Sequence, residues 1–258
     1  VPFYDPNFGD VGQIHDITAT LGYLSAITEH VTLGSAGYVS PLREPILTAK
    51  EAASIDHLSG GRFVLGLAGG DRPSEYPAFG KEFDNRAERF QENWQVIRRL
   101  TEQSFPRFGT EHGGSFFGNL DLVPKPVQGR LPMMTVGRAR QDLRWIANES
   151  DGWLWYSADL PRLRSLMAEL ERLNESGIWR PFGTCNFVEL LEDASAPLQV
   201  FNSIYLRGGS RALSDFYAQQ AEAGVAHVTA NLKPTRRPPL ETMQDFLENI
   251  VPQFRAGA

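Results

Sequence analysis

Hydrophobic positions along the chain follow two spacings, one typical of strands and one typical of helices. Short apolar runs such as residues 62–69 and 131–137 lack polar alternation, which is typical of parallel strands that are covered on both faces. Each run precedes a segment whose apolar residues recur every three or four positions, which places them on one helix face. The pattern predicts six strands, each followed by a helix.

The predicted strands share this apolar character and lie at residues 31–39, 62–69, 131–137, 151–157, 185–191 and 225–232. Asp16 and Pro45 are residues typical of helix starts, and the glycines at 60–61 are typical of a helix end. The expected inward faces of three of the helices comprise Ile46, Ala49 and Ala53; Phe90, Trp94, Ile97 and Leu100; and Leu240, Met243, Leu247 and Ile250.

Parallel strands need crossover helices, and eight βα units close a barrel. The six strands, with residues 1–3 as the tail of another, predict an α/β fold of the TIM (β/α)8 barrel type. In this interpretation the first strand–helix unit and most of the second are missing from the given chain. The alternative is an open doubly wound sheet, which is disfavoured because no G-x-G-x-x-G opens a helix. We expect one domain over residues 1–258, with an insertion-like segment at 104–129.

Composition narrows the class of protein. With 41% hydrophobic and 22% charged residues, the chain is unlike a disordered protein. A net charge of −6 argues against nucleic-acid and anionic-membrane partners, and no apolar run reaches the roughly 18 residues that a membrane span needs. The single thiol, Cys185, cannot form an internal disulfide, so we expect a cytoplasmic location. Cys185 is either a small buried hydrophobe or a nucleophile, and no histidine lies in a metal-ligand motif.

Candidate chemistry gathers where the strands end, because βα loops build the active site of such barrels. Gly69 and Gly70 end one strand and precede Asp71 and Arg72. Small residues there allow a flat or bulky ligand to approach the backbone. The alternative for Asp71 and Arg72 is a local ion pair that closes a turn. Residues 35–44 occupy a second strand end of the same kind.

Residues 137–141, "GRARQ", follow another strand and precede a helix. Arg138 and Arg140 have the fork-shaped donors that suit phosphate, next to the positive end of a helix dipole. The alternative is a surface loop with two solvated arginines. Trp155 or Tyr156, near a further strand end, is a candidate for lining a pocket, whereas Trp153 is expected in the core.

The chain resembles the luciferase-like, flavin-dependent monooxygenase superfamily in several long motifs. These are T-x-x-V-x-L-G-S, A-K-E-A-A-S-I-D-x-L-S-G-G-R and L-G-x-A-x-G within residues 27–80, and the block "GRLPMMTVGRARQDLRWIANESDGWLWY" at 129–156. The forms "GDRPSEYPAFG" and "GRARQ" are most similar to a bacterial subfamily of luciferase-type oxidoreductases. Position 44 departs from that subfamily, because it holds Glu where histidine is usual.

The resemblance implies a barrel that binds FMN at its C-terminal mouth and uses reduced FMN and O₂ to oxygenate a small organic substrate. It implies a separate flavin reductase and a homodimer, and it suggests a cis peptide bond at Ala36–Gly37. The positions implied to contact the cofactor are Ser35, Ala36, Gly37, Gly69, Gly70, Asp71, Arg72, Gly137, Arg138, Ala139, Arg140, Gln141 and Trp155.

Three alternatives stay open. An F420-dependent oxidoreductase on the same barrel would transfer hydride and would need basic residues for the acidic tail of F420, for which Arg43, Arg138, Arg140 and Arg236 are candidates. A non-catalytic relative would bind flavin without turnover. An unrelated phosphate-binding barrel enzyme, such as a lyase, would bind a sugar phosphate and show no flavin spectrum. The catalytic residue stays unassigned, because relatives often place it on a strand that precedes residue 1.

Overall fold

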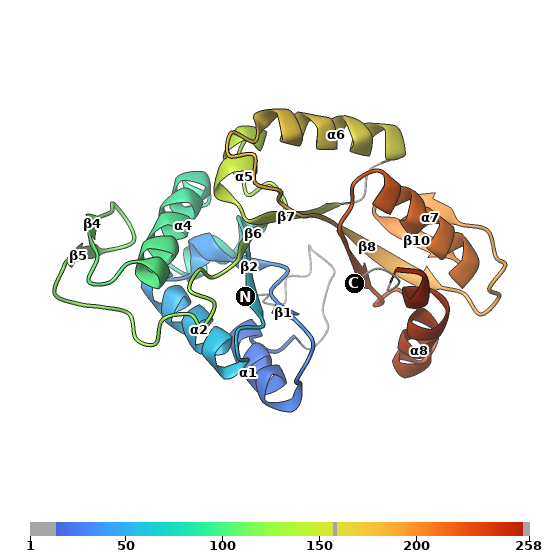
Figure 1. Cartoon of the computed structure of the whole chain (residues 1–258), viewed down its shortest axis with the longest axis horizontal. Helices are drawn as coiled ribbons and strands as arrows, with labels where there is room; N and C mark the ends of the chain where they lie inside the picture. Colours follow the sequence, from blue (N-terminus) through green and yellow to red (C-terminus); the bar gives the residue numbers. More distant parts are fainter. Residues whose placement is uncertain (1–13, 157–158, 255–258) are drawn as a thin grey trace. The chain divides into compact units, whose positions relative to one another are not determined.

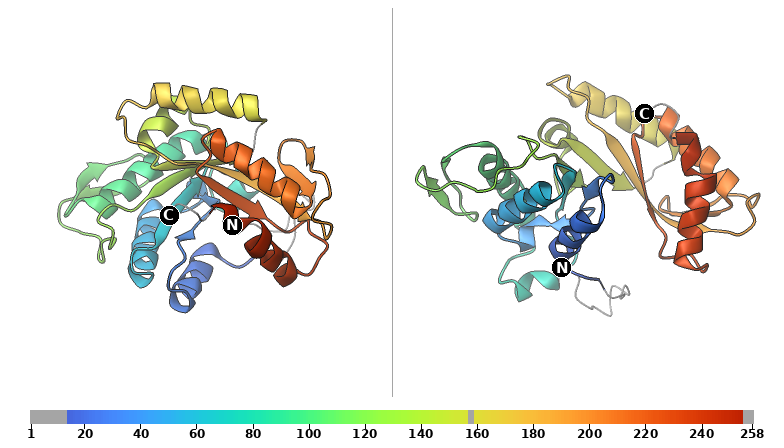
Figure 2. Two further views of the ribbon diagram at one scale, coloured as in Figure 1. Left: turned by 45° about the vertical axis from the view of Figure 1, so that its right-hand side comes forward. Right: turned by 60° about the horizontal axis from the view of Figure 1, so that its bottom comes forward.

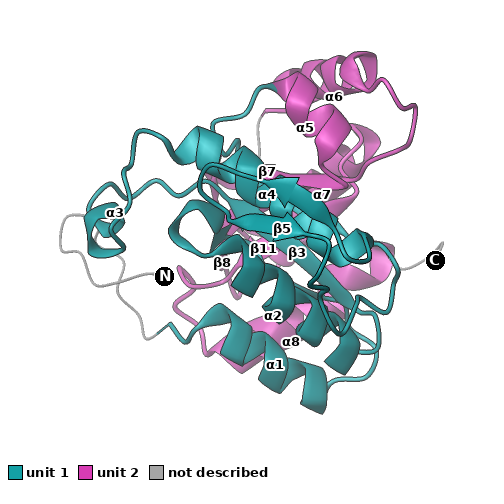
Figure 3. Cartoon of the chain, turned by 90° about the vertical axis from the view of Figure 1, so that its left-hand side faces the viewer, with its two compact units in different colours: residues 1–142 teal, residues 143–258 magenta. Residues whose placement is uncertain are grey.

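In the described residues of the computed structural model, helices follow the predicted strands, and additional short strands lie between some of them. The structure describes residues 14–156 and 159–254, so the expected strand tail at residues 1–3 lies outside the described residues. The chain divides into two units, residues 1–142 and residues 143–258, which Figure 3 shows in different colours. Each unit contains its own strands and covering helices.

The strand β3 lies at the centre of the N-terminal unit, and its parallel partners are β1, β2 and β6. The helices α1, α2 and α4 gather together beside these strands (Figures 1 and 2). The elements of this unit are α1 (Ile17–Ile27), β1 (Leu33–Gly34), β2 (Tyr38–Val39), the 3-10 helix η1 (Ser40–Leu42), α2 (Pro45–Leu58), β3 (Phe63–Ala68), α3 (Glu75–Ala78), α4 (Arg86–Glu102), β4 (Arg107–Gly109), β5 (Ser115–Phe117) and β6 (Met133–Val136).

The long strand β8 organises the C-terminal unit, where it pairs in parallel with β7, β10 and β11. The short strands β9 and β10 pair antiparallel, and the sequence pattern did not predict them. The elements are α5 (Leu143–Glu149), β7 (Gly152–Tyr156), α6 (Leu160–Leu173), β8 (Phe182–Leu190), β9 (Gln199–Phe201), β10 (Tyr205–Gly208), α7 (Ser210–Glu222), β11 (His227–Asn231), α8 (Pro239–Asn249) and the 3-10 helix η2 (Val251–Phe254).

Polar side chains close the ends of α1. The Asp16 carboxylate accepts hydrogen bonds from the backbone N–H of Thr18 and of Ala19. The hydroxyl of Thr18 and the guanidinium of Arg43 hold the pKa of Asp16 well below its usual range. At the other end, Arg62 donates to the carbonyl oxygen of Thr28 at 2.7 Å, so a cation stabilises the helix C-terminus.

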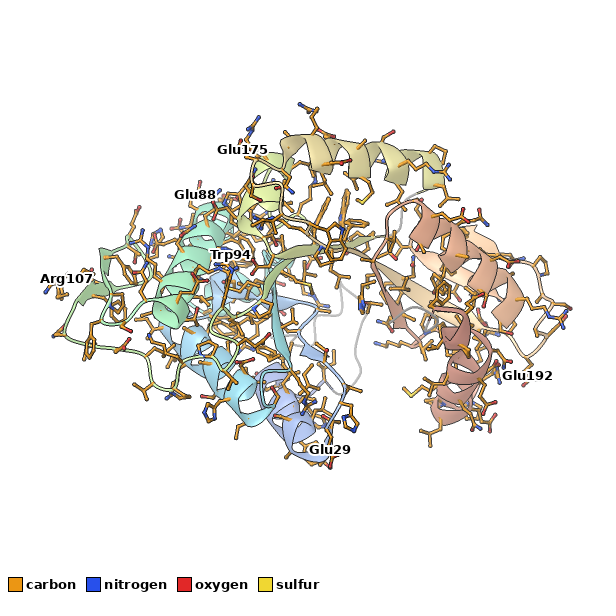
Figure 4. All side chains as sticks on the ribbon, in the orientation of Figure 1. Glu29, Glu88, Trp94, Arg107, Glu175 and Glu192 are labelled. Atoms are coloured by element: carbon orange, nitrogen blue, oxygen red, sulfur yellow. The ribbon has the colours of Figure 1, made fainter. Side chains whose placement is uncertain are left out.

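The predicted inward face of α4 is confirmed, because Phe90, Trp94, Ile97 and Leu100 are all buried. Figure 4 labels Trp94 among the packed side chains of the N-terminal unit. Ala49 and Ala53 of α2 are also buried as predicted, but the prediction for Ile46 was wrong. Ile46 is exposed, because α2 packs through Thr48, Ala49, Ala52 and Ala53 instead.

The predicted inward face of α8 was largely wrong. Leu240 is 80% exposed, and Met243 and Leu247 are also exposed, whereas Ile250 is buried as predicted. The inward positions are instead Thr242, Phe246 and Ile250, which are spaced four residues apart, and Phe246 and Ile250 pack on the cluster around Val188 and Leu213.

The segment 104–129, predicted to be irregular, contains the hairpin β4–β5, on the outer side of α4 (Figure 1). The Glu92 carboxylate of α4 accepts backbone N–H groups of His112 and Gly113, each at 2.6 Å. Further along, the buried Asp56 carboxylate accepts the N–H of Val127 at 2.7 Å and the side-chain amide of Gln128 at 2.6 Å. Two carboxylates therefore fix this segment to α4 and α2.

The strand predicted at 31–39 is divided by a β-bulge. Gly34 pairs with Val64, and Tyr38 pairs with Leu67, so four steps on one chain match three on β3. The extra residue lies within Ser35–Gly37, and β-bulges of this kind re-aim the chain next to functional sites. The expected cis bond at Ala36–Gly37 was wrong: this bond is trans, and the cis bond in the described residues is Val123–Pro124.

The Ser35 side chain fills the bulge. Its hydroxyl accepts the N–H of Gly66 at 2.8 Å and donates to the carbonyl oxygen of the same residue at 2.9 Å. The carbonyl oxygen of Ser35 lies 1.8 Å from the point where a Cβ on residue 66 would stand. Only glycine therefore fits at position 66.

We expect Gly66→Ala to lower the free energy of unfolding by more than about 3 kcal/mol, because the new methyl group overlaps backbone that cannot yield. Gly22→Ala is the matched control in α1, where an added Cβ meets nothing within 4 Å. It should stabilise the protein by roughly 0.5–1 kcal/mol through helix propensity. Urea denaturation measures both, and a harmless Gly66→Ala would show that the bulge is not held as described.

Candidate functional site

Two glycines form a tight corner where β3 ends. Gly70 has a φ of +73°, in the left-handed region that favours glycine. A Cβ there would lie 2.6 Å from Cγ1 of Val39, and a Cβ on Gly69 would lie 2.9 Å from Cα of Ala139. The ends of β2, β3 and the segment after β6 therefore meet at this corner, as predicted for the carboxyl ends of neighbouring parallel strands.

Tyr76 of α3 stabilises this glycine corner through a hydrogen bond. Its hydroxyl donates to the carbonyl oxygen of Gly69 at 2.7 Å, and its ring meets Phe83 edge-on with centroids 5.1 Å apart. Burial raises the pKa of Tyr76 to about 12, so the hydroxyl stays a neutral donor at physiological pH. Sequence reasoning missed Tyr76, although an aromatic residue soon after the glycine pair is a usable signal for such a support.

The charged residues after the corner differ in their surroundings. Asp71 is exposed, and Arg72 lies 4.0 Å from the Glu75 carboxylate in a half-buried pair. Arg72 therefore pairs with Glu75, the first residue of α3. Asp71 and Arg72 both follow the carboxyl end of β3, and their predicted contacts with a cofactor stay predictions.

The segment 137–141 turns sharply after β6. Gly137, Ala139 and Arg140 have φ values of +66°, +46° and +63°, all in the left-handed region. Arg138 and Arg140 are exposed, whereas Ala139 and Gln141 are buried. The predicted anion loop therefore presents its two guanidinium groups outward. The following helix, α5, begins at Leu143 and has seven residues.

The two faces of the N-terminal sheet differ in the size of their side chains. Tyr38, Phe63 and Leu65 face α1 and α2, where they surround a small void with residues of those helices. The opposite face, which alternates with the first, carries small or half-buried residues. They are Gly34, Val39, Val64, Gly66, Ala68, Met134 and Val136. Apart from the buried Gly66, the residues of this face are half-buried or exposed, unlike those on the helix-covered face.

Tyr38 and Arg43 form a network under the bulge. The buried Tyr38 hydroxyl donates to Glu51 at 2.6 Å, and the Arg43 guanidinium lies over the Tyr38 ring at 4.3 Å and donates to Asp16 at 3.1 Å. Burial and the hydrogen bond to Glu51 raise the pKa of Tyr38. Arg43 was a candidate for an acidic cofactor tail, but it is only 17% exposed and is committed to this network.

Trp155 lies in the C-terminal unit and on the helix-covered face of its sheet. Its ring stacks on that of the buried Trp153 with centroids 5.0 Å apart, and it packs against the cluster that contains Leu163. Tyr156 points to the opposite face and is exposed. Tyr156 is therefore better placed than Trp155 to line a pocket, and the cofactor role of Trp155 stays a prediction.

A charged cluster near the carboxyl end of β8 was missed by sequence reasoning. The buried Glu189 carboxylate accepts the Tyr205 hydroxyl at 2.6 Å and Nε of Arg207 at 3.0 Å. Arg236, 92% exposed, lies 3.8 Å from the same carboxylate. The signal was an acid inside the apolar run "FVELL", but the partners come from β10, which the pattern did not predict.

Cys185 lies on the same face of β8 as Glu189. Burial raises the pKa of the Cys185 thiol, which disfavours its role as a nucleophile.

A cavity of about 480 Å³ lies at the opposite, amino-terminal ends of β7 and β8. Trp153, Met167, Leu170 and Phe182 form its apolar wall. In α/β barrels this end contributes stability rather than catalysis, so we assign the cavity to the packing of α5 and α6 on the strands.

No helix in the described ranges 14–156 and 159–254 is long and apolar enough to cross a membrane.

The family model of luciferase-like monooxygenases matches residues 3–236. The chain belongs to the luciferase-like monooxygenase family. An uncharacterised protein of Mycobacterium tuberculosis is 32% identical over 168 residues, which cover 64% of this chain and 56% of that protein. An alkanal monooxygenase beta chain of Photorhabdus luminescens is 29% identical over 94 residues, 36% of this chain and 29% of that protein. The chain thus spans about half the length, or less, of the curated relatives it matches.

Several solved structures share the fold of this chain. A monooxygenase from Streptomyces bottropensis has a TM-score of 0.77 at 16% identity, over 93% of this chain and 83% of that one. A coenzyme F420-dependent tetrahydromethanopterin reductase from Methanopyrus kandleri has a TM-score of 0.77 at 15% identity, over 93% of this chain and 88% of that one. A 3,6-diketocamphane monooxygenase from Pseudomonas putida, in complex with FMN, has a TM-score of 0.73 at 10% identity, over 92% of this chain and 84% of that one. The predicted TIM-barrel class is confirmed, and the expectation of one domain stays a prediction.

We expect Tyr76→Phe to lower the free energy of unfolding by about 1–2 kcal/mol, because the buried Gly69 carbonyl loses its donor. Tyr23→Phe is the matched control, since Tyr23 is exposed on α1. Its effect should stay within about 0.5 kcal/mol. Urea denaturation compares the two, and equal stabilities would mean that Tyr76 does not hold the corner.

Proposed function

We propose that this protein is a flavin-dependent monooxygenase that uses reduced FMN and O₂ to oxygenate a small organic substrate. The observation that carries the proposal is the meeting of three strand ends in the N-terminal unit. The carboxyl end of β2 at Val39, the glycine corner at 69–70 and the arginine loop at 137–141 lie at the ends of the neighbouring strands β2, β3 and β6. In a barrel of this family, that is the end at which ligands bind.

The residues at these strand ends fit FMN. The face of β3 that points away from α1 and α2 carries Gly66 and Ala68, and Ala36 and Gly37 are exposed in the bulge. Arg138 and Arg140 have donors that match a phosphate, and both are exposed. The donor set therefore suits a ligand with a flat apolar part and an anionic end.

Each part of the site has a separate task in this proposal. FMN, when bound in its reduced form, supplies the chemistry that activates O₂. The bulge and the glycine corner position the ring, and the two arginines neutralise the phosphate. The aromatic residues of the hairpin β4–β5 do not belong to these strand ends, because Phe116 is buried against Phe108 and Phe117 is exposed on the hairpin itself.

Coenzyme F420 is the alternative cofactor, because structural neighbours include proteins that use it. An F420-dependent secondary alcohol dehydrogenase has a TM-score of 0.77 at 15% identity, over 96% of this chain and 86% of that one. The long acidic tail of F420 calls for further cations. Arg43 is committed to Asp16 and Tyr38, and Arg236 lies beside Glu189, which favours FMN. A separate reductase, a homodimer and a cytoplasmic location remain predictions.

We expect the intact protein to bind reduced FMN more tightly than oxidised FMN or F420, measured by quenching of tryptophan fluorescence under nitrogen. Arg138→Gln combined with Arg140→Gln should weaken FMN binding about tenfold or more, through loss of two charge-assisted contacts. Arg144→Gln is the control, since Arg144 is paired with Glu175 on the surface of the other unit.

Preferential binding of F420 would move the protein to hydride transfer and contradict the monooxygenase proposal. Binding of FMN without substrate-dependent oxygen consumption, tested over short-chain and medium-chain aldehydes, ketones and sulfonates, would instead favour a non-catalytic flavin carrier. If neither FMN nor F420 binds, the cofactor proposal is wrong.

A further inference from the structure

The loop at 137–141 alternates between residues that face inward and residues that face outward. Ala139 and Gln141 are 8% and 5% exposed, whereas Arg138 and Arg140 are exposed to solvent. The sequence grouped all of these residues as cofactor contacts. The structure separates them into two exposed arginines and two buried, uncharged side chains.

The loop needs an anchor because its backbone is strained. Ala139 and Arg140 are not glycines, yet their φ values are +46° and +63°. A residue with a Cβ loses roughly 1–2 kcal/mol in this conformation, so the surrounding structure must hold it there. Strain of this kind concentrates at ligand-binding segments.

Gln141 fixes this loop through hydrogen bonds of its side chain. Its side-chain amide donates to the carbonyl oxygen of Ala139 at 2.9 Å and to that of Ala87 on α4 at 3.2 Å, and its carbonyl oxygen accepts from Gln91. Its own backbone N–H donates to the Arg138 carbonyl oxygen at 2.7 Å. The opposite side of the loop rests on the glycine corner, where Gly69 leaves room for the Ala139 backbone.

We infer that Gln141 is a positioning residue, which fixes the left-handed loop so that Arg138 and Arg140 are held ready for the cofactor phosphate. This inference rests on the proposed function. The buried amide is neutral and bonded on the α4 side, so it acts on the phosphate through the loop. A loop already held in the bound conformation loses less freedom on binding, which favours affinity.

The experiment compares dissociation constants for FMN and for riboflavin, which lacks the phosphate, on the full chain. Gln141→Met keeps the length of the side chain and removes its hydrogen bonds. We expect this substitution to raise the dissociation constant for FMN about tenfold and to change that for riboflavin less than about twofold. The dissociation constant for riboflavin divided by that for FMN therefore falls. Gln91→Met removes one partner only and should shift the ratio in the same direction by less.

Gln220→Met is the control for general damage, because Gln220 is equally buried and binds Thr184 in the C-terminal unit. It should lower stability and leave the ratio unchanged. An unchanged ratio in Gln141→Met, or an equal loss of both flavins, would overturn the inference while leaving FMN binding intact. Failure of the unsubstituted protein to bind either flavin would overturn the proposed function and this inference together.

Discussion

The Ser35 hydroxyl binds both backbone groups of Gly66 at the point where β1 and β2 gain one residue on β3. Without that side chain, the bulge would leave a buried N–H and a buried carbonyl oxygen without partners. The bulge sets the position of β2, and β2 carries Val39 to the glycine corner. The geometry of the strand ends in the N-terminal unit therefore depends on this contact and on the absence of a Cβ at position 66.

Close backbone approach recurs at the other strand ends of this unit. Gly69 makes room for Ala139, and Gly70 makes room for Val39 and for the Tyr76 hydroxyl. Neutral hydrogen bonds from Tyr76 and Gln141 then hold the corner and the loop from the protein side. Charged groups stay on the outer side, which is the arrangement that a phosphate-bearing ligand needs. Rigid neutral anchors and exposed cations thus have different tasks within one short stretch of chain.

The sequence predicted the barrel class, most strand positions and the buried face of α4, because apolar spacing reports which residues face a core. It did not predict which face of α8 packs. Leu240 and Ile250 fit the same apolar helix face equally well by spacing, and only tertiary contacts decide which face is buried. Glycine and arginine residues at strand ends predicted a candidate site, and their contacts with a cofactor stay a prediction. The inward turn of Gln141 and the side of β7 on which Trp155 lies depend on backbone direction, which single residues do not report.

Hydrogen–deuterium exchange of the intact protein, with and without FMN under nitrogen, tests the central claim most directly. If the strand ends hold the cofactor, FMN will slow exchange in residues 35–42, 69–76 and 137–142 and leave the helices α7 and α8 unchanged. Slower exchange confined to residues 146–153 and 167–182, which line the cavity at the amino-terminal ends of β7 and β8, would place the flavin at the other end of the strands and contradict the claim.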